Sequence, residues 1–262
     1  MKRIRLAGIV TLCALIPLLA PTVLVVLASL SQGELLTFPP RGFTIHWYSE
    51  MFTNSAVWTA LGNSLFVAGV SVGINILCGV PAAIALPHVG RYSRTLFTVL
   101  LSLGLSSPTI VTAFAYFDLY GRIGVRGSLT AVAVAVAVTC FPFMLWTVLA
   151  AIEDTDPNVV PAAATLGADP VEQFLFVRLP LLAPGIVTGA LVVFVLSITD
   201  FVVSQVLTTI DNQTLPVFVY SGLRGAISPA LGAVSAFFIA VVALAFAVVL
   251  RLGKVERFLF RT

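Results

Sequence analysis

Charged residues are scarce in this chain. Only 10% of its 262 residues are Asp, Glu, Lys or Arg, whereas 59% are hydrophobic and the mean hydropathy is +1.09. A soluble domain could not hide that much apolar surface. Runs of about 20 apolar residues recur, the length that a helix needs to cross a hydrocarbon core of about 30 Å. The composition therefore excludes a soluble domain and predicts an all-α polytopic membrane protein.

Groups that carry out chemistry are also few. The only two histidines, His46 and His88, fall in expected loops, and no Cys/His cluster has the spacing of a metal site. The phosphate-binding pattern Gly-x-x-x-x-Gly-Lys-Ser/Thr is missing, so we expect no ATP, metal or other cofactor on this chain. An intramembrane protease would need a serine–histidine pair or two aspartates within spans, and only Asp200 lies in one. These absences argue against an enzyme.

Cysteine is equally rare. The three cysteines, Cys13, Cys78 and Cys140, all lie inside apolar blocks, and their number is odd. We interpret them as small buried residues rather than a disulfide framework.

The apolar runs predict one transmembrane domain over residues 1–262 with six helices. We place them at about 7–30, 60–86, 95–117, 128–150, 185–208 and 230–251. The first run, from Leu6 to Leu30, follows the basic start MKRIR and resembles a signal peptide with a small-residue site near Ala28. Because a signal peptide has an apolar region of only about 7–15 residues, we expect a retained span.

The basic residues predict the orientation. With the N-terminus inside, the inner segments hold ten lysines and arginines and the outer segments hold four, which favours both termini in the cytoplasm. The inner ten are Lys2, Arg3, Arg5, Arg91, Arg94, Arg178, Arg251, Lys254, Arg257 and Arg261, and the outer four are Arg41, Arg122, Arg126 and Arg224.

The most informative polar segment lies between the fourth and fifth spans, in an inner loop at about 152–183. Asp156-Pro157 is a helix start, with aspartate as the N-cap and proline at the first helical position. Gly167 is suited to end that helix, since glycine tolerates the left-handed conformation. Asp169-Pro170 repeats the start signal. We expect two short helices, over 157–166 and 170–177, before Leu179-Pro180 and Pro184-Gly185 turn the chain into the fifth span.

This loop resembles the "EAA" loop of binding-protein-dependent ABC importer permeases. The matching positions are Ala162, Ala163, Gly167, Val177, Leu179 and Pro180, and Ala168 and Asp169 lie in the same turn. The resemblance implies that an ATPase docks on these residues and transmits force through them. The glutamate of that pattern is replaced by Pro161, which would lie about one turn into the first helix and shorten or kink it. An interfacial hairpin that merely links two spans would explain the capping but not the complete spacing.

The resemblance extends to the whole chain and to one branch of the family. The blocks TLPVFVYSGLRGAISPALGAVSAFFI (214–239), FPPRGFTIHWY (38–48) and SITDFVVSQ (197–205) are similar to the polyamine-type permeases, in particular the subunit PotC of spermidine/putrescine importers. The branch also includes importers of aminoethylphosphonate, ferric iron and other small solutes. Two departures weaken the polyamine assignment: Thr109 stands where an acidic residue is frequent, and Thr199 stands beside Asp200 where two aspartates are frequent.

Asp200 is the clearest candidate for the substrate pathway. Burying a charge within a span costs about 2.5–3.5 kcal/mol or more, so its side chain should face a cavity or a partner. It would either attract a substrate ammonium group or cap a broken helix, and the sequence leaves both readings open. The further candidates for the pathway are Thr109, Tyr116, Thr199, Ser204 and Gln205. At the outer end of the third span, Asp118 could shape the exit or pair with Arg122.

The resemblance also implies a location in a bacterial inner membrane, and it implies the partners. We expect the permease subunit of an ATP-driven importer, most simply for a polyamine, paired with a second, homologous permease. An ATPase dimer would hold ATP and Mg, and an extracytoplasmic solute-binding protein would deliver the substrate. A stand-alone secondary transporter is the rival interpretation. It predicts several intramembrane ionisable residues and no docking loop, whereas this chain has one such residue and a complete loop.

Overall fold

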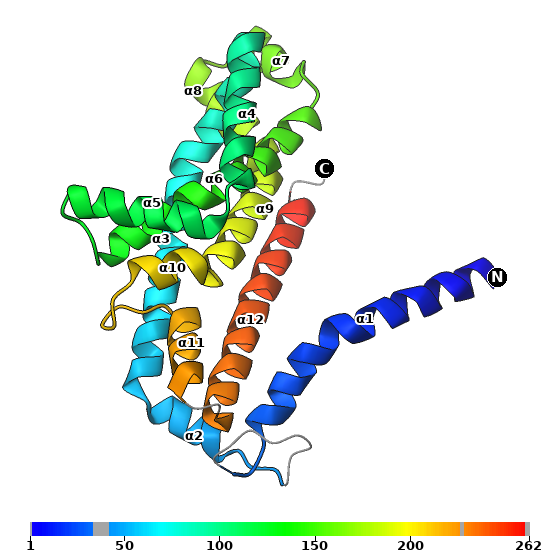
Figure 1. The fold of residues 1–262 in the computed structure, drawn as a ribbon. Coiled ribbons are helices and arrows are strands. Elements are labelled where there is room, and N and C mark those ends of the chain that lie inside the picture. The colour runs from blue at the N-terminus through cyan, green and yellow to red at the C-terminus, as the bar shows by residue number, and fades with distance from the viewer. Residues whose placement is uncertain (1, 34–41, 226–227, 260–262) are drawn as a thin grey trace. The chain divides into compact units, whose positions relative to one another are not determined.

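The computed structural model describes residues 2–33, 42–225 and 228–259, and their regular elements are helices (Figure 1). The chain divides into two compact units, Met1–Ala60 with Leu215–Ala243, and Leu61–Thr214 with Leu244–Thr262. Side chains are described for residues 15–33, 42–225 and 228–248. Phe38–Arg41 of the outer-loop motif and the basic side chains counted near both termini lie outside these ranges.

The first unit is held together by polar contacts of the segment that precedes α3. It contains α1 (Lys2–Ser29), α2 (His46–Thr53), α11 (Leu215–Gly225) and the first half of α12 (Pro229–Leu259). The Trp47 indole N–H donates to the Ser31 carbonyl at 3.0 Å, and Tyr48 shares a 2.6 Å hydrogen bond with Ser29. The rings of Phe52, Trp58 and Phe237 pack edge to face or tilted. Trp47 and Tyr48 thus have hydrogen-bond partners within the chain.

The second unit contains the loop and the candidate pathway. Its elements are α3 (Ser55–Ala85, from Leu61), the short 3₁₀ turn η1 (Leu86–His88), α4 (Arg91–Ser106), α5 (Thr109–Arg122), α6 (Leu129–Glu153), α7 (Val159–Thr165), α8 (Pro170–Glu172), the π-helix η2 (Gln173–Arg178), α9 (Leu179–Ile198) and α10 (Val202–Leu207). Its core centres on α6, where Met144, Leu145 and Val148 are fully buried.

The described helices match only part of the six predicted spans, and the described part of the first, Leu15–Ser29, is a shorter apolar helix. Four are long and apolar enough to cross a membrane: Ser55–His88, Leu129–Glu153, Pro170–Ile198 and Pro229–Val248. The expected single helix over 95–117 is instead two helices, α4 and α5, bent by 100°. The bend lies at Ser107-Pro108, because a residue before proline is pushed out of the helical region. The pair would make a fifth span if counted as one, and the number six stays a prediction.

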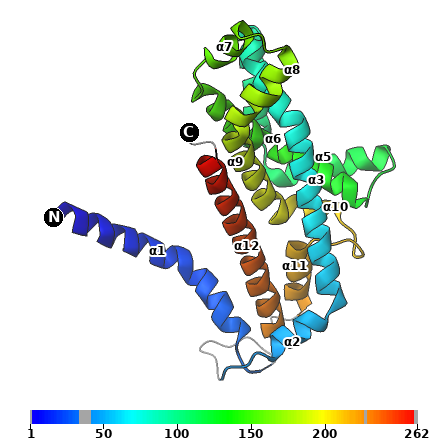
Figure 2. The ribbon, with the colours of Figure 1, turned by 180° about the vertical axis from the view of Figure 1, so that it is seen from behind.

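The fifth expected span is also interrupted. Its helix α9 ends at Ile198, three residues are not helical, and α10 follows as a separate short helix that packs against α5. Figures 1 and 2 both show α5 and α10 side by side, across the direction of α6 and α9. Asp200 therefore lies in a break between helices rather than within one.

Two glycines bring α6 and α9 into close contact. A methyl group on Gly185 would lie 2.5 Å from the Ala151 Cβ and 2.8 Å from the Thr147 carbonyl oxygen. A methyl group on Gly189 would overlap the Thr147 hydroxyl and lie 2.7 Å from the Met144 sulfur. Small residues four apart are a recurrent device for close helix approach in membranes. The two helices run side by side in both views (Figures 1 and 2) and act as one packed pair.

Polar groups join α3 to the same central helix. The Ser71 hydroxyl donates to the Ala133 carbonyl at 3.0 Å, and the Asn75 amide donates to the Ala137 carbonyl at 3.0 Å. Both donors are fully buried and lie one turn apart, as do their acceptors. Interhelical bonds of this kind contribute about 0.6 kcal/mol each on average within membranes. Helix α6 is thus in contact with both α3 and α9.

The glycine contact predicts a large effect for a small substitution. We expect Gly185→Ala to destabilise the chain by about 1–3 kcal/mol, because the new methyl group meets backbone that cannot move aside. The matched control is Gly73→Ala in α3, where an added Cβ meets nothing within 4 Å. The measurement is the midpoint of thermal unfolding in detergent. Equal midpoints for the two variants would show that α6 and α9 do not depend on this contact.

Candidate functional site

The loop between α6 and α9 begins with a turn rather than with the expected helix start. The Asp156 carboxylate accepts from the Asn158 backbone N–H at 2.9 Å and from its side-chain amide at 3.0 Å. Asn158 takes the N-cap position, and α7 begins at Val159, two residues later than expected. Pro161 is therefore the third helical residue, where no intrahelical N–H bond is required. The helix accommodates it without a break, contrary to the expected kink.

A turn of fixed geometry ends α7. Gly167 has φ +92°, the left-handed region that the sequence predicted for it. The Ala168 N–H donates to the Ala163 carbonyl at 3.1 Å, and the Gly167 N–H donates to the Ala164 carbonyl at 3.1 Å. This pair of bonds is the Schellman motif, which satisfies carbonyls that a helix end leaves free.

The second helix of the loop starts with a complete capping box. Asp169 Oδ1 accepts from the N–H groups of Val171 and Glu172, both at 2.8 Å, and Glu172 accepts from the Asp169 N–H at 3.0 Å. The Gln173 amide donates to the Ala168 carbonyl at 2.7 Å, across the turn. Residues 163–173 therefore form an elbow (the coupling elbow) in which both helix ends are closed by short-range hydrogen bonds.

The end of the loop differs from expectation. After α8 the chain continues as the π-helix η2 and then directly as α9, so Leu179 and Pro180 lie in the first turn of a long helix. Pro184 and Gly185 lie inside that helix and produce no turn. Leu179-Pro180 fits there because the first turn of a helix requires no N–H donor from proline. Val177, Leu179 and Pro180 are half-buried at this junction.

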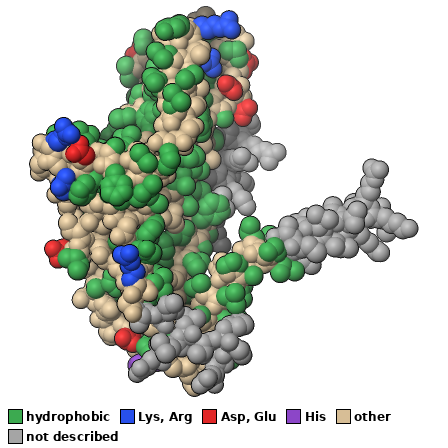
Figure 3. All heavy atoms as spheres, in the orientation of Figure 1, with side chains coloured by type: hydrophobic (Ala, Val, Ile, Leu, Met, Phe, Trp, Pro, Cys, Tyr) green, Lys and Arg blue, Asp and Glu red, His purple; other side chains and the backbone are tan. Residues whose placement is uncertain are grey.

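The coupling elbow presents apolar side chains on a polar part of the chain. Leu166 at its tip is 88% exposed, and Val171 and Phe176 beside it are 63% and 75% exposed. Ala162 is exposed, whereas Ala163 and Ala168 are half-buried under the turn. Figure 3 shows that charged side chains gather at the end of the second unit that bears α7 and α8. Exposed apolar groups rimmed by charges are typical of a protein-binding surface.

The carboxylate of the candidate pathway is held inside the chain. Asp200 Oδ2 accepts from the Ser204 backbone N–H at 2.8 Å and from the Ser204 hydroxyl at 2.9 Å, at the start of α10. Ser204 is fully buried, Asp200 is half-buried, and Thr199 is exposed with its hydroxyl donating to the Val195 carbonyl at 2.6 Å. The backbone N–H of Val203 also hydrogen-bonds this carboxylate. The Asp200 side chain thus closes the start of α10 with donors from two residues, Val203 and Ser204.

The remaining pathway candidates lie on α5 and α10. Gln205 on α10 has a buried side-chain oxygen with no hydrogen-bond partner among the described residues. Tyr116 on α5 stacks on Tyr120, with ring centroids 5.9 Å apart, and Thr109 is exposed at the first position of α5. Because α10 packs against α5, these residues lie on neighbouring elements. At the end of α5, Asp118 forms a 2.8 Å ion pair with Arg122. Of the two roles expected for Asp118, the structure therefore shows the pairing with Arg122.

Comparisons with known proteins show to which class of protein the chain belongs. Residues 75–257 match the family model described as "Binding-protein-dependent transport system inner membrane component". The chain belongs to this family. The predicted permease of an ABC importer is thereby confirmed, and the chain is a transport subunit rather than an enzyme. The multi-pass membrane location follows from the family and from the apolar helices.

Relatives of this permease are named for polyamine transport. It is 27% identical over 226 residues to the putrescine transport system permease protein PotI of Escherichia coli K12, covering 83% of this chain and 80% of the relative. It is 29% identical over 195 residues to the spermidine/putrescine transport system permease protein PotC of the same strain, covering 74% of each. PotC of Haemophilus influenzae is 26% identical over 199 residues, covering 76% and 77%.

Solved structures share the permease fold. A chain of a bacterial ABC transporter that imports alginate matches with a TM-score of 0.70 at 19% identity, covering 96% of this chain and 98% of that one. A chain of the MetNI methionine ABC transporter in an inward-facing conformation matches at 0.64 and 18%, covering 77% and 94%. The all-α permease fold predicted from the sequence is confirmed.

Two features of this permease escaped the sequence reasoning. Gly185 and Gly189 form a Gly-x-x-x-Gly pattern, which the expected turn at Pro184-Gly185 concealed. Arg178, counted only as an inner basic residue, lines a cavity behind α7. The first had a recognisable signal in the chain. The second depends on segments far apart in sequence and had none.

The capping box predicts a local effect in the coupling elbow. We expect Asp169→Ala to weaken the start of α8 by about 1 kcal/mol, which speeds amide exchange at Val171 and Glu172 about fivefold. The measurement is hydrogen exchange by mass spectrometry on peptides covering 166–176. The control is Asp154→Ala, an exposed aspartate of the same loop that accepts no described hydrogen bond. Unchanged exchange in the Asp169 variant would contradict the role of the box.

Proposed function

We propose that this permease forms half of a polyamine path and that the coupling elbow receives the force of a separate ATPase. In this proposal both termini are cytoplasmic, a second homologous permease completes the path, and the ATPase dimer holds ATP and Mg. A solute-binding protein delivers the substrate from outside. The solved relatives include an alginate transporter in complex with a periplasmic protein, which supports the kinds of partner.

The proposed transmission of force is supported by the position of the coupling elbow. It joins the end of α6 to the start of α9, and these two helices are locked by Gly185 and Gly189. A force on the elbow therefore moves both helices together instead of bending one. Helix α9 has 20 residues and is about 30 Å long, and the break that holds Asp200 follows its far end. Movement of the elbow is thereby delivered to the candidate pathway.

The substrate class rests on the relatives and on Asp200. The relatives PotI and PotC are named for putrescine and spermidine. A half-buried carboxylate is suited to accept a hydrogen bond from an ammonium group. This carboxylate alone does not distinguish the alternatives, because aminoethylphosphonate also carries an ammonium group and ferric iron also binds oxygen ligands. The first experiment is calorimetry of the cognate solute-binding protein with spermidine, putrescine, aminoethylphosphonate and ferric iron. Micromolar or tighter binding of a polyamine supports the proposal, and binding of a phosphonate or iron alone refutes it.

The exposed tip of the elbow yields a prediction about the ATPase. We expect Leu166→Arg to weaken retention of the ATPase subunit about tenfold or more, because the interface loses a buried leucine and gains an unpaired charge. The measurement is the ATPase-to-permease ratio after purification through a tag on the permease. Ile210→Arg is the matched control, since Ile210 is 84% exposed in the loop after α10. Full retention with Leu166→Arg would place the docking surface elsewhere.

Substitutions at Asp200 separate its two roles. Asn keeps an oxygen that can cap α10 but removes the charge, whereas Ala removes both. We expect Asp200→Asn to raise the KM for putrescine uptake in proteoliposomes of the complete transporter about tenfold, with unchanged thermal stability. Ser204→Ala, which removes one bond of the cap and keeps the charge, is the control. Normal uptake by the Asn variant with failure of the Ala variant would show that Asp200 serves only as a cap.

A further inference from the structure

A cavity of about 410 Å³ lies between α7 and the ends of the membrane helices. Its apolar walls come from four elements: Ile84 at the end of α3, Ile152 at the end of α6, Val160 in α7, and Leu181 and Leu182 at the start of α9. The volume is in the range of small-molecule sites. All of these residues belong to the second unit. The cavity thus lies behind the coupling elbow, at the level where the apolar helices meet the polar loop.

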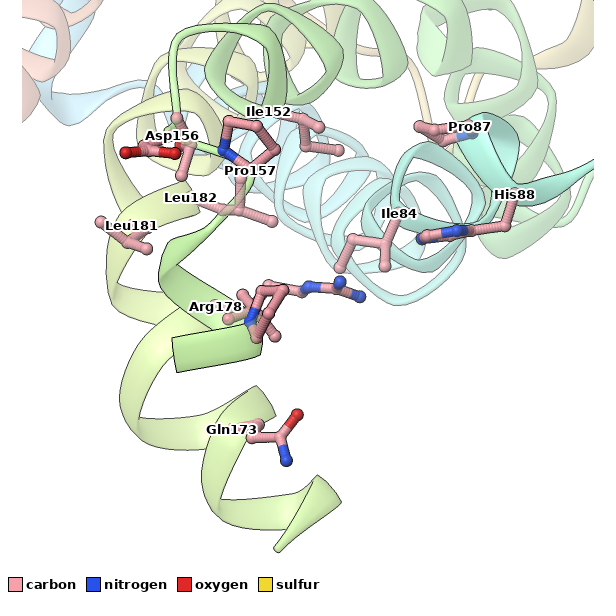
Figure 4. Close-up of a pocket in the computed structure, with 13 residues that line it drawn as sticks. Ile84, Pro87, His88, Ile152, Asp156, Pro157, Gln173, Arg178, Leu181 and Leu182 are labelled. Carbon is pink, nitrogen blue, oxygen red and sulfur yellow. The ribbon is translucent and has the colours of Figure 1, made fainter. Parts of the chain in front are cut away.

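One cation, Arg178, enters this apolar cavity and forms no ion pair with a described residue. Arg178 lines it and is half-buried, and its guanidinium forms no hydrogen bond or ion pair with any described residue. Figure 4 shows the guanidinium extending toward Ile84 and His88, on the opposite side of the cavity from Asp156. A guanidinium that is partly withdrawn from water favours a planar anion that it can bind with two hydrogen bonds.

The other polar groups of the cavity, His88 apart, form hydrogen bonds elsewhere or lie away from the Arg178 guanidinium. Asp156, the only acidic residue of the lining, has Oδ1 bound twice by Asn158. The Thr155 hydroxyl donates to the Ala151 carbonyl at 2.8 Å, and the Gln173 amide donates to the Ala168 carbonyl. Pro161 contributes an apolar ring at the rim. The chain therefore provides apolar walls and places its one lining carboxylate, Asp156, on the other side of the cavity from the Arg178 guanidinium (Figure 4).

We propose that this cavity binds the headgroup of an anionic phospholipid, with the phosphate on Arg178 and the first methylenes of the acyl chains along the apolar walls. The combination of apolar helix ends and a basic side chain at the membrane surface fits such a ligand, since basic pockets between spans on the cytoplasmic side hold lipid headgroups. A carboxylate from the docked ATPase would match the charge but not the apolar walls behind α7. The assignment of this lipid to the cytoplasmic leaflet depends on the proposed orientation of the chain, whereas the proposal that a lipid binds here does not.

A lipid headgroup bound in this cavity would lie between the loop that holds the coupling elbow and the ends of the membrane helices. A headgroup in this position contacts α7 on one side and the ends of α3, α6 and α9 on the other. It would fill space that is otherwise open between the elbow and the helices that the elbow moves.

The test uses the complete transporter, purified in detergent and analysed by native mass spectrometry during titration with palmitoyl-oleoyl phosphatidylglycerol. Phosphatidylcholine with the same chains and inorganic phosphate are the comparison probes. We expect one phosphatidylglycerol per copy of this chain, and we expect Arg178→Gln to weaken its binding about fivefold to tenfold, to the level of phosphatidylcholine. Arg94→Gln is the control, because Arg94 is an exposed inner arginine outside the cavity.

A second variant keeps the arginine and blocks the site. Pro161→Glu puts a carboxylate at the rim, where it can occupy Arg178, and we expect a similar loss of phosphatidylglycerol with the thermal midpoint retained. Equal lipid retention in the Arg178 and Arg94 variants would overturn the proposal. Loss of the ATPase subunit with unchanged lipid in Arg178→Gln would assign Arg178 to the ATPase instead. Displacement of the lipid by millimolar inorganic phosphate would reduce the site to one for phosphate alone.

Discussion

The close approach of α6 and α9 is the contact on which the rest of the second unit depends. Gly185 and Gly189 let the backbone of α9 lie against Thr147 and Met144 of α6 at distances that any side chain would prevent. In a membrane, where lipid is as apolar as the helices, such packing must replace the hydrophobic effect as the source of association. Helix α6 also accepts the polar contacts from α3. It is therefore the common support of the loop and of the candidate pathway.

The coupling elbow is stiff for reasons that are almost entirely local. A Schellman turn closes α7, a capping box opens α8, and Gln173 joins the two. Each device satisfies backbone groups that would otherwise be exposed at helix ends. A connection of this length would ordinarily be the most mobile part of a membrane protein. Here the hydrogen bonds make the loop a rigid extension of the α6–α9 pair, as the proposed transmission of force requires.

Local chemistry is what the sequence could predict, and long-range packing is what it could not. The roles of Gly167 and Asp169-Pro170 followed from caps that need only neighbouring residues. The helix start at Pro157 was wrong because Asp156 binds Asn158 in a turn instead of capping. The turn expected at Pro184-Gly185 was wrong. Proline and glycine are typical of turns, but glycine also allows close helix packing, and only the presence of α6 decides between the two. Pro108 could have indicated a bend at this position, but nothing in the sequence indicated that its angle is 100°.

The break after α9 unites the two interpretations of Asp200 that the sequence left open. A charged residue inside a continuous apolar helix would have to be neutralised by a distant partner. In the break, Ser204 provides two donors to one oxygen, so the cost of keeping a carboxylate there falls without consuming its whole hydrogen-bonding capacity. Capping is then the condition that lets the charge persist beside α5. The cap role of Asp200 is thus compatible with the proposed pathway role, because a carboxylate that accepts hydrogen bonds at the start of α10 keeps further lone pairs.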